Sequence, residues 1–162
     1  MFENSYKIRV SSRAIILDED KILLNEFGGG QYYNFIGGGI EENETAKEAV
    51  VREIMEESGL TADVGELVFS LEYEPTSCNF SGGKNHHISV FFRCHIDKSV
   101  LPQKPSHTDI DPDNPTITSV AKWVPLSELS SINMLPKIAE PLIKYFETGV
   151  FSPSFWAENE HL

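Results

Sequence analysis

The apolar residues occur in short runs that are separated by glycine, proline, asparagine and acidic residues, a pattern that predicts a chain of short strands and helices. Residues Arg9 to Leu17 and Lys21 to Glu26 are apolar and β-branched runs, and the three acidic residues between them predict a hairpin. Further strands are predicted at Gln31 to Ile36, Leu67 to Tyr73, Ile88 to His95 and Ile117 to Val124, and helices at Pro125 to Leu129 and Lys137 to Thr148. In the remaining tail we interpret Phe155 and Trp156 as packed aromatic residues.

The best-bounded helix is predicted between Thr45 and Ser58. Thr45 followed by Glu48 fits a capping box, and Gly59 stands where a left-handed residue commonly ends a helix. At about 100° per residue, the apolar residues of this segment share one arc, which we expect to enter the core. The residues of this arc are Ala46, Val50, Val51, Ile54 and Met55.

Three glutamates on the same helix carry the candidate chemistry. Glu53, Glu56 and Glu57 stand at positions i, i+3 and i+4 and are therefore neighbours, with Glu57 at the edge of the apolar arc. At about 6 Å and an effective dielectric of about 20, each like-charged pair costs on the order of 2 to 3 kcal/mol. A divalent cation would remove that cost, and oxygen-only ligands favour Mg²⁺ or Mn²⁺ over zinc. A solvated acidic face is the alternative for the helix taken alone.

The residues around the helix extend this pattern. The chain reads Gly38, five residues, Glu44, seven residues, and then the run from Arg52 to Leu60, and it thereby resembles the Nudix box at every defining position. Seven fixed and two aliphatic residues would coincide by chance on the order of once in a million or less. Where the usual family pattern has a proline before the glycines, this chain has Ile36, a change that removes no ligand or catalytic group.

The resemblance to Nudix hydrolases implies both a fold and an activity. The fold is α/β, a Nudix-type α/β/α sandwich around a mixed β-sheet, in a single domain over residues 1–162. The activity is that of a pyrophosphohydrolase that uses Mg²⁺ or Mn²⁺ to hydrolyse a diphosphate linkage in a nucleoside-diphosphate-X type substrate. Carried over onto this chain, the metal ligands are Glu53, Glu56, Glu57 and the Gly37 carbonyl, Glu53 being either a ligand or the base, while Arg52 orients Glu53 and Glu44 supports from the loop.

The substrate stays open among ADP-ribose, a nucleotide sugar, an oxidised nucleoside triphosphate and a dinucleoside polyphosphate. Pro75 lies fifteen residues after Leu60, a spacing that resembles the marker of Nudix enzymes acting on ADP-ribose. Candidates for stacking on a base are Tyr32, Tyr33, Phe35, Phe80 and Trp123, although such residues more often belong to a core. Candidates for one more acidic ligand or base are Asp109, Asp111 and Asp113.

Two other functions compete with the hydrolase. One is a noncatalytic Nudix-like module that senses a nucleotide; such modules typically lose the carboxylates of the box, and this chain keeps them all. The other is a related metal-dependent reaction such as isoprenoid diphosphate isomerisation, for which the chain has no second set of motifs.

Composition and charge limit the kinds of molecule that the protein can bind. Asp and Glu number 25 against 13 Lys and Arg, and the net charge of −12 repels duplex nucleic acid and makes cations necessary for a phosphorylated substrate. No segment approaches the roughly 18 apolar residues of a membrane span, and the N-terminal sequence has no secretory pattern, so we predict a cytoplasmic protein with a nucleotide-derived small-molecule substrate. Cys78 and Cys94 are predicted to be free thiols. The oligomeric state stays open, a homodimer included.

Overall fold

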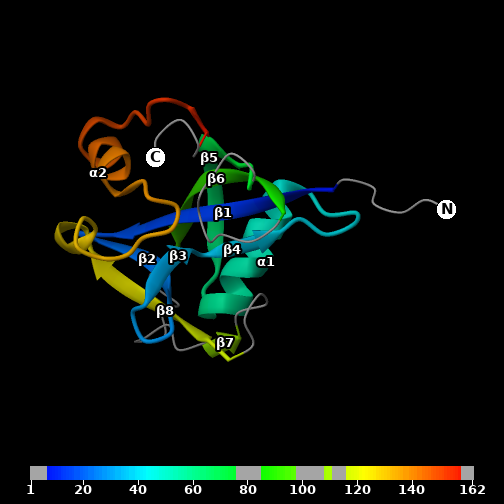
Figure 1. The fold of residues 1–162 in the computed structure, drawn as a ribbon, viewed down its shortest axis with the longest axis horizontal. Helices are drawn as coiled ribbons and strands as arrows, with labels where there is room; N and C mark the ends of the chain where they lie inside the picture. The colour runs from blue at the N-terminus through cyan, green and yellow to red at the C-terminus, as the bar shows by residue number, and fades with distance from the viewer. Residues whose placement is uncertain (1–6, 76–84, 98–107, 111–115, 158–162) are drawn as a thin grey trace.

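The computed structural model describes residues 7–75, 85–97, 108–110 and 116–157, and for residues 108–110 it describes the backbone only. Figure 1 shows a twisted sheet in which β1 is a long central strand, with α1 and α2 well apart. In chain order the elements are β1 (Ile8–Asp18), β2 (Lys21–Phe27), β3 (Tyr32–Phe35), β4 (Gly37–Gly39), α1 (Ala46–Ser58), β5 (Ala62–Tyr73), β6 (His86–Ile96), β7 (Thr108–Ile110), β8 (Thr118–Pro125), the 3₁₀ helix η2 (Leu126–Glu128), α2 (Ala139–Thr148) and β9 (Phe155–Ala157).

The strands form one mixed sheet in the order β7-β8-β2-β1-β6-β5-β9, with β3 added to β2 and β4 added to β1. Strand β1 is parallel to β6 but antiparallel to β2 and β4. It therefore joins the two halves of the sheet, and β4 brings the second glycine triplet against its middle. No helix within the described ranges is long and apolar enough to cross a membrane.

Successive residues of β1 point to opposite faces of the sheet and enter two separate cores. Ile15 belongs to a cluster that includes Leu142 and Tyr145 of α2. Ala14 and Ile16 belong to a second cluster, which includes Val50 and Ile54 of α1. The sheet therefore lies between the two helices, and the predicted α/β/α sandwich around a mixed sheet is confirmed.

Most predicted elements are present, with corrected limits. The hairpin between β1 and β2 is confirmed, as is the helix between the two cap residues. Strand β5 begins at Ala62, five residues before the predicted start, because main-chain pairing with β6 continues where the side chains no longer alternate. The segment from Pro125 to Leu129 forms a single 3₁₀ turn, and α2 begins at Ala139. Strands β4, β7 and β9 were not predicted; β9 forms by pairing with β5, and a three-residue strand has too few side chains to show an alternating pattern. In β9, Trp156 packs against the core as predicted, whereas Phe155 is 50% exposed and its predicted packing is wrong.

The predicted core-facing arc of α1 is partly wrong. Val51 and Met55 are 40% and 43% exposed. The buried residues of the helix are Ala49, Val50, Ile54 and Ser58. At about 100° per residue, Glu53 and Glu57 fall between Ala49 and Val50, so the helix is rotated from the predicted orientation and turns these two glutamates toward the protein.

Candidate functional site

Local capping sets both ends of the helix that carries the glutamates. The Thr45 hydroxyl accepts a hydrogen bond from the Glu48 N–H at 3.3 Å, and a Glu48 carboxylate oxygen accepts from the Thr45 N–H at 2.8 Å. Gly59 ends the helix at φ 71°. The Ser12 hydroxyl donates to the Ala46 carbonyl at 2.6 Å, which fastens the first turn of α1 to β1. These contacts place the rest of the helix over β4.

The glycine residues of β4 allow a close approach between this strand, β1 and the helix. Gly37 has φ 136°, and a Cβ there would collide with the carbonyl oxygen of Ser12 and lie 2.8 Å from the Arg13 Cα. A Cβ on Gly38 would overlap the Glu53 carboxylate, with the Glu53 Cδ at 2.7 Å. At Gly37 the colliding atoms are backbone and φ is positive, so this position needs glycine, whereas a side chain at Gly38 would displace the flexible Glu53 carboxylate. Ile36, in the position of the usual proline, is fully buried below the helix.

Arg52 joins three of the carboxylates singled out by the sequence. Its Nε and Nη2 donate to the two oxygens of the Glu44 carboxylate at 2.8 and 3.0 Å, a bidentate contact. Its Nη1 donates to Glu53 Oε1 at 2.9 Å and to Glu56 Oε2 at 3.2 Å, and Nη2 also reaches the Gly39 carbonyl at 3.1 Å. The Arg52 guanidinium lowers the pKa of the Glu44 carboxyl, and the same hydrogen bond raises the pKa of Arg52. The positive charge of Arg52 therefore offsets part of the repulsion among the carboxylates, which the sequence analysis expected a divalent cation to remove.

Glu57 lies one turn after Glu53 on α1 and is hydrogen-bonded to the backbone of β4. Its Oε2 accepts a hydrogen bond from the Gly37 N–H at 2.7 Å. Burial raises the pKa of Glu57 to about 7, and the negative charge of Glu53 adds to that effect. The Gly37 hydrogen bond, the positive charge of Arg13 and a side-chain hydrogen bond with Asn25 act in the opposite direction. A partly buried carboxylate with few compensating charges is therefore held at the point where β4 meets the helix.

Arg13 is a charged residue of this site that the sequence interpretation missed. From β1 its Nη1 donates to the Phe35 carbonyl at 3.1 Å and to the Gly37 carbonyl at 2.7 Å. Burial lowers the pKa of Arg13, while the negative charges of Glu57 and Glu53 oppose that effect. The available signal was an arginine directly before the apolar run Ala14 to Leu17 of a predicted strand, a place where a charge needs partners. The Gly37 carbonyl, predicted as a ligand, is therefore already in contact with a cation.

The donor chemistry of the site suits a hard divalent cation, but the side chains are turned to other partners. Glu53, Glu56 and Glu57 supply only carboxylate oxygens, which Mg²⁺ and Mn²⁺ prefer. Across the described residues, no three His, Cys, Asp or Glu side chains are grouped so that they could hold a metal ion. Glu53 and Glu56 bond to Arg52, and Glu57 bonds to Gly37. The predicted convergence of the three carboxylates is therefore absent, and a cation would fit after rotation of side chains, most easily of Glu56, which is 56% exposed.

The remaining residues singled out by the sequence lie partly within and partly outside the described residues. Asp109 lies in β7, where its backbone pairs with Ser119 of β8, whereas Asp111 and Asp113 lie outside the described residues. Pro75 lies in the turn after β5. Among the described cysteines, Cys94 is a free thiol and is buried, as predicted, and Cys78 lies outside the described residues.

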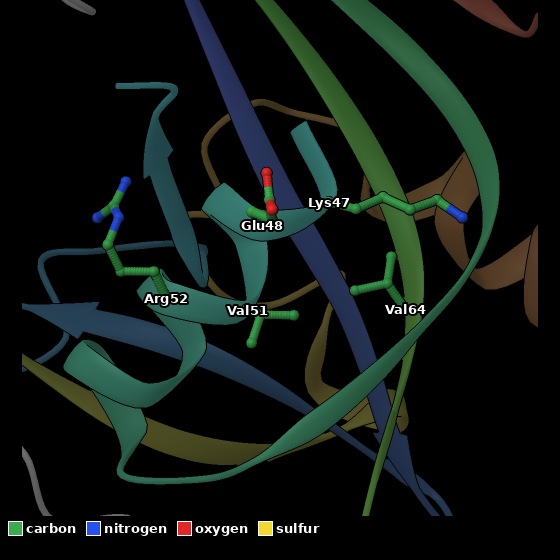
Figure 2. Close-up of a pocket in the computed structure, with 5 residues that line it drawn as sticks. All are labelled: Lys47, Glu48, Val51, Arg52 and Val64. Carbon is green, nitrogen blue, oxygen red and sulfur yellow. The ribbon is translucent and has the colours of Figure 1, made fainter. Parts of the chain in front are cut away.

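A shallow depression of about 390 Å³ lies on another part of α1. Figure 2 shows Val51 of α1 facing Val64 of β5, with the guanidinium of Arg52 turned away from both. Lys47 and Glu48 complete the lining. None of the three predicted metal-binding glutamates borders this depression, but Arg52 does, so the depression adjoins the candidate site without including those glutamates.

Comparisons with known proteins agree with the fold. The family model described as NUDIX domain matches residues 7–146. A NUDIX hydrolase from Nitrosomonas europaea has a similar structure, with a TM-score of 0.65 at 21% identity over 91% of this chain and 93% of that chain. A UDP-X diphosphatase gives a TM-score of 0.64 at 17% identity over 95% of this chain and 69% of that chain. An ADP-ribose pyrophosphatase from Streptococcus suis gives 0.59 at 24% identity over 92% and 96% of the two chains. At these identities the likeness to the solved structures shows the fold.

Proposed function

Because the chain belongs to the NUDIX domain family, we propose that it is a metal-dependent pyrophosphohydrolase that cleaves a diphosphate linkage in a nucleotide derivative. The observation that carries the proposal is the placement of Glu53 and Glu57 beside the glycine strand β4, with Arg52 joining Glu53 to Glu44 and Glu56. An acidic solvated face would not require this arrangement. Both a diphosphate and its leaving group are anionic, so such a site needs a cation in order to bind them.

The residues that would hold Mg²⁺ or Mn²⁺ are Glu56 and Glu57, with the Gly37 carbonyl as a further oxygen donor. When bound, the ion neutralises charge on the diphosphate oxygens and makes the attacking water more acidic. The Gly37 carbonyl oxygen has two lone pairs, and the contact with Arg13 at 2.7 Å uses one of them.

The other residues position the groups that move a proton. We assign Glu53 as the base that accepts the proton of the attacking water. Arg52 donates a hydrogen bond to Glu53 Oε1 at 2.9 Å and also donates to both oxygens of Glu44. The bidentate contact with Glu44 fixes the Arg52 guanidinium, which in turn orients Glu53. Gly38 leaves the space that the Glu53 carboxylate occupies.

The test is a substrate panel combined with matched glutamate variants. The protein is incubated with ADP-ribose, nucleotide sugars, oxidised nucleoside triphosphates and dinucleoside polyphosphates, in Mg²⁺, in Mn²⁺ and in a chelator, and released nucleoside monophosphate is measured. We expect metal-dependent turnover that Glu53→Gln lowers by roughly 10²- to 10⁴-fold. Glu42→Gln, which changes an exposed glutamate in the loop before α1, is the matched control and should keep full activity.

The outcomes separate the competing functions. Nucleotide binding without turnover of any compound would indicate a noncatalytic sensing module instead. Isomerisation of an isoprenoid diphosphate, with no nucleotide cleaved, would indicate the related metal-dependent reaction. Turnover that Glu53→Gln leaves unchanged would refute the assigned base.

A further inference from the structure

Two aromatic rings lie on the same side of the sheet as the proposed catalytic carboxylates. Phe27 of β2 and Tyr32 of β3 are directly opposite each other in the antiparallel register. Their rings stack with centroids 4.6 Å apart and an interplanar angle of 7°, and both residues are partly exposed. Since side chains alternate along a strand, Phe27 shares its face with Asn25, which bonds to Glu57. The stacked pair therefore lies beside the α1 face of the site.

The same alternation removes two of the other described aromatic candidates, and packing argues against a third. Tyr33 and Phe35 point to the opposite face, where they are 9% and 0% exposed within the core that α2 covers. Trp123 packs against the core beneath α1. Phe80 lies outside the described residues. Of the aromatic residues considered from the sequence, Tyr32 is the described one that is both near the carboxylates and outside the two cores.

The spacing between the rings and the carboxylates suits a nucleotide. Asn25 pairs with Asn34 across the two strands, and the Asn25 side chain is hydrogen-bonded to Glu57. The aromatic pair lies two residues further along the strands, roughly 7 Å away at the usual rise. That separation matches the single ribose that stands between a nucleobase and its first phosphate. A phosphate held near Glu57 would therefore place the base at the rings.

We propose that Phe27 and Tyr32 form a stacking platform that selects base-carrying diphosphates over diphosphates without a base. The inference rests on the proposed function and names the substrate class of the same site. A flat π-face binds any nucleobase, so the platform distinguishes a nucleotide from a sugar phosphate more strongly than one base from another. The asparagine pair beside it lies where the ribose would pass.

The experiment compares binding of AMP with binding of ribose 5-phosphate, the same phosphorylated sugar without a base. Calorimetry in Mg²⁺ on the full chain measures both affinities for wild type, Tyr32→Leu, Phe27→Leu and Tyr32→Phe. The matched control is Phe155→Leu, a 50% exposed aromatic residue on β9 at the opposite edge of the sheet. Circular dichroism checks that each variant is folded.

We expect Tyr32→Leu and Phe27→Leu to weaken AMP binding about tenfold and to change ribose 5-phosphate binding less than about twofold. Tyr32→Phe keeps the ring and should bind AMP like wild type, as should Phe155→Leu. Equal weakening of both ligands, no weakening of AMP, or a wild type that does not prefer AMP would each overturn the platform. If Tyr32→Leu is unfolded, Phe27→Leu and Tyr32→Phe still decide the question.

The two proposals fail in different ways. A wild type that prefers AMP in a ring-dependent manner but hydrolyses no diphosphate keeps the platform and refutes the hydrolase. A wild type that hydrolyses nucleotide diphosphates without preferring AMP to ribose 5-phosphate keeps the hydrolase and refutes the platform.

Discussion

Replacing Glu57 with glutamine tests whether the proposed site is kept at a cost in stability. Glu57 is partly buried, and burial raises its pKa to about 7 from an ordinary value of 4.5. The folded protein therefore binds more protons than the unfolded chain between these two values. By linkage, the free energy of unfolding is highest below about pH 4.5 with respect to this group, and it falls as pH rises through about 7. Glutamine does not titrate, so Glu57→Gln should lack this fall.

The magnitude follows from the two pKa values. One pKa unit corresponds to about 1.36 kcal/mol, so the difference between 4.5 and about 7 gives an upper bound of about 3.4 kcal/mol. Because the side chain is still partly in contact with water, we expect about 2 kcal/mol. In glutamine the side-chain carbonyl can still accept from the Gly37 N–H, so the hydrogen bond at 2.7 Å is retained in kind.

The assay is urea unfolding of wild type and Glu57→Gln at about pH 5 and about pH 8, in a chelator. Relative to wild type, the variant should gain about 2 kcal/mol on going from the lower to the higher pH. Added Mg²⁺ at the higher pH should stabilise wild type more than the variant, since the ion binds the ionised carboxylate. Glu56→Gln, which removes a mostly exposed carboxylate from the same helix, controls for the loss of one negative charge. A stability difference between wild type and Glu57→Gln that is the same at both pH values would refute the reasoning.

Three further predictions concern the cap, the glycine strand and the guanidinium. Thr45→Ala removes the side-chain cap of α1 and should lower the free energy of unfolding by about 1 kcal/mol, so an unchanged urea midpoint would contradict it. Gly38→Ala places a methyl group against the Glu53 carboxylate and should lower kcat while circular dichroism stays unchanged; full activity would show that this space is not needed. Arg52→Lys keeps the charge but cannot contact Glu44 and Glu53 with a planar fork, so kcat should fall about tenfold with KM near wild type. A rise in KM alone would assign Arg52 to substrate binding.

The sequence predicted those parts of the fold whose cause is local. The capping box at Thr45 and the left-handed Gly59 act within one turn of α1, so its ends could be derived from residues a few positions apart. The turn between β1 and β2 was predictable for the same reason. The regular spacing from Gly38 to Leu60 also gathered the proposed site residues into one short segment, which is why the sequence alone named nearly all of them.

The tertiary structure decided the features that depend on residues far apart in the chain. Hydrophobic periodicity placed Val51 and Met55 in the core, yet the helix is rotated so that Glu57 faces inward. That rotation is tolerated because the Gly37 N–H and the charge of Arg13 compensate the buried carboxylate, and neither contact is visible from the helix sequence.

The same reason separates the aromatic residues. Tyr32 and Tyr33 are neighbours with the same chemistry in sequence, but strand pairing sends Tyr33 into the core and Tyr32 onto Phe27. Local patterns determine which element forms and where it ends, because their energies arise within a few residues. Which face of a strand or helix packs against which neighbour is determined by pairing between distant segments. In this protein that pairing places Arg13 next to Glu57 and places the rings of Phe27 and Tyr32 on the same face of the sheet.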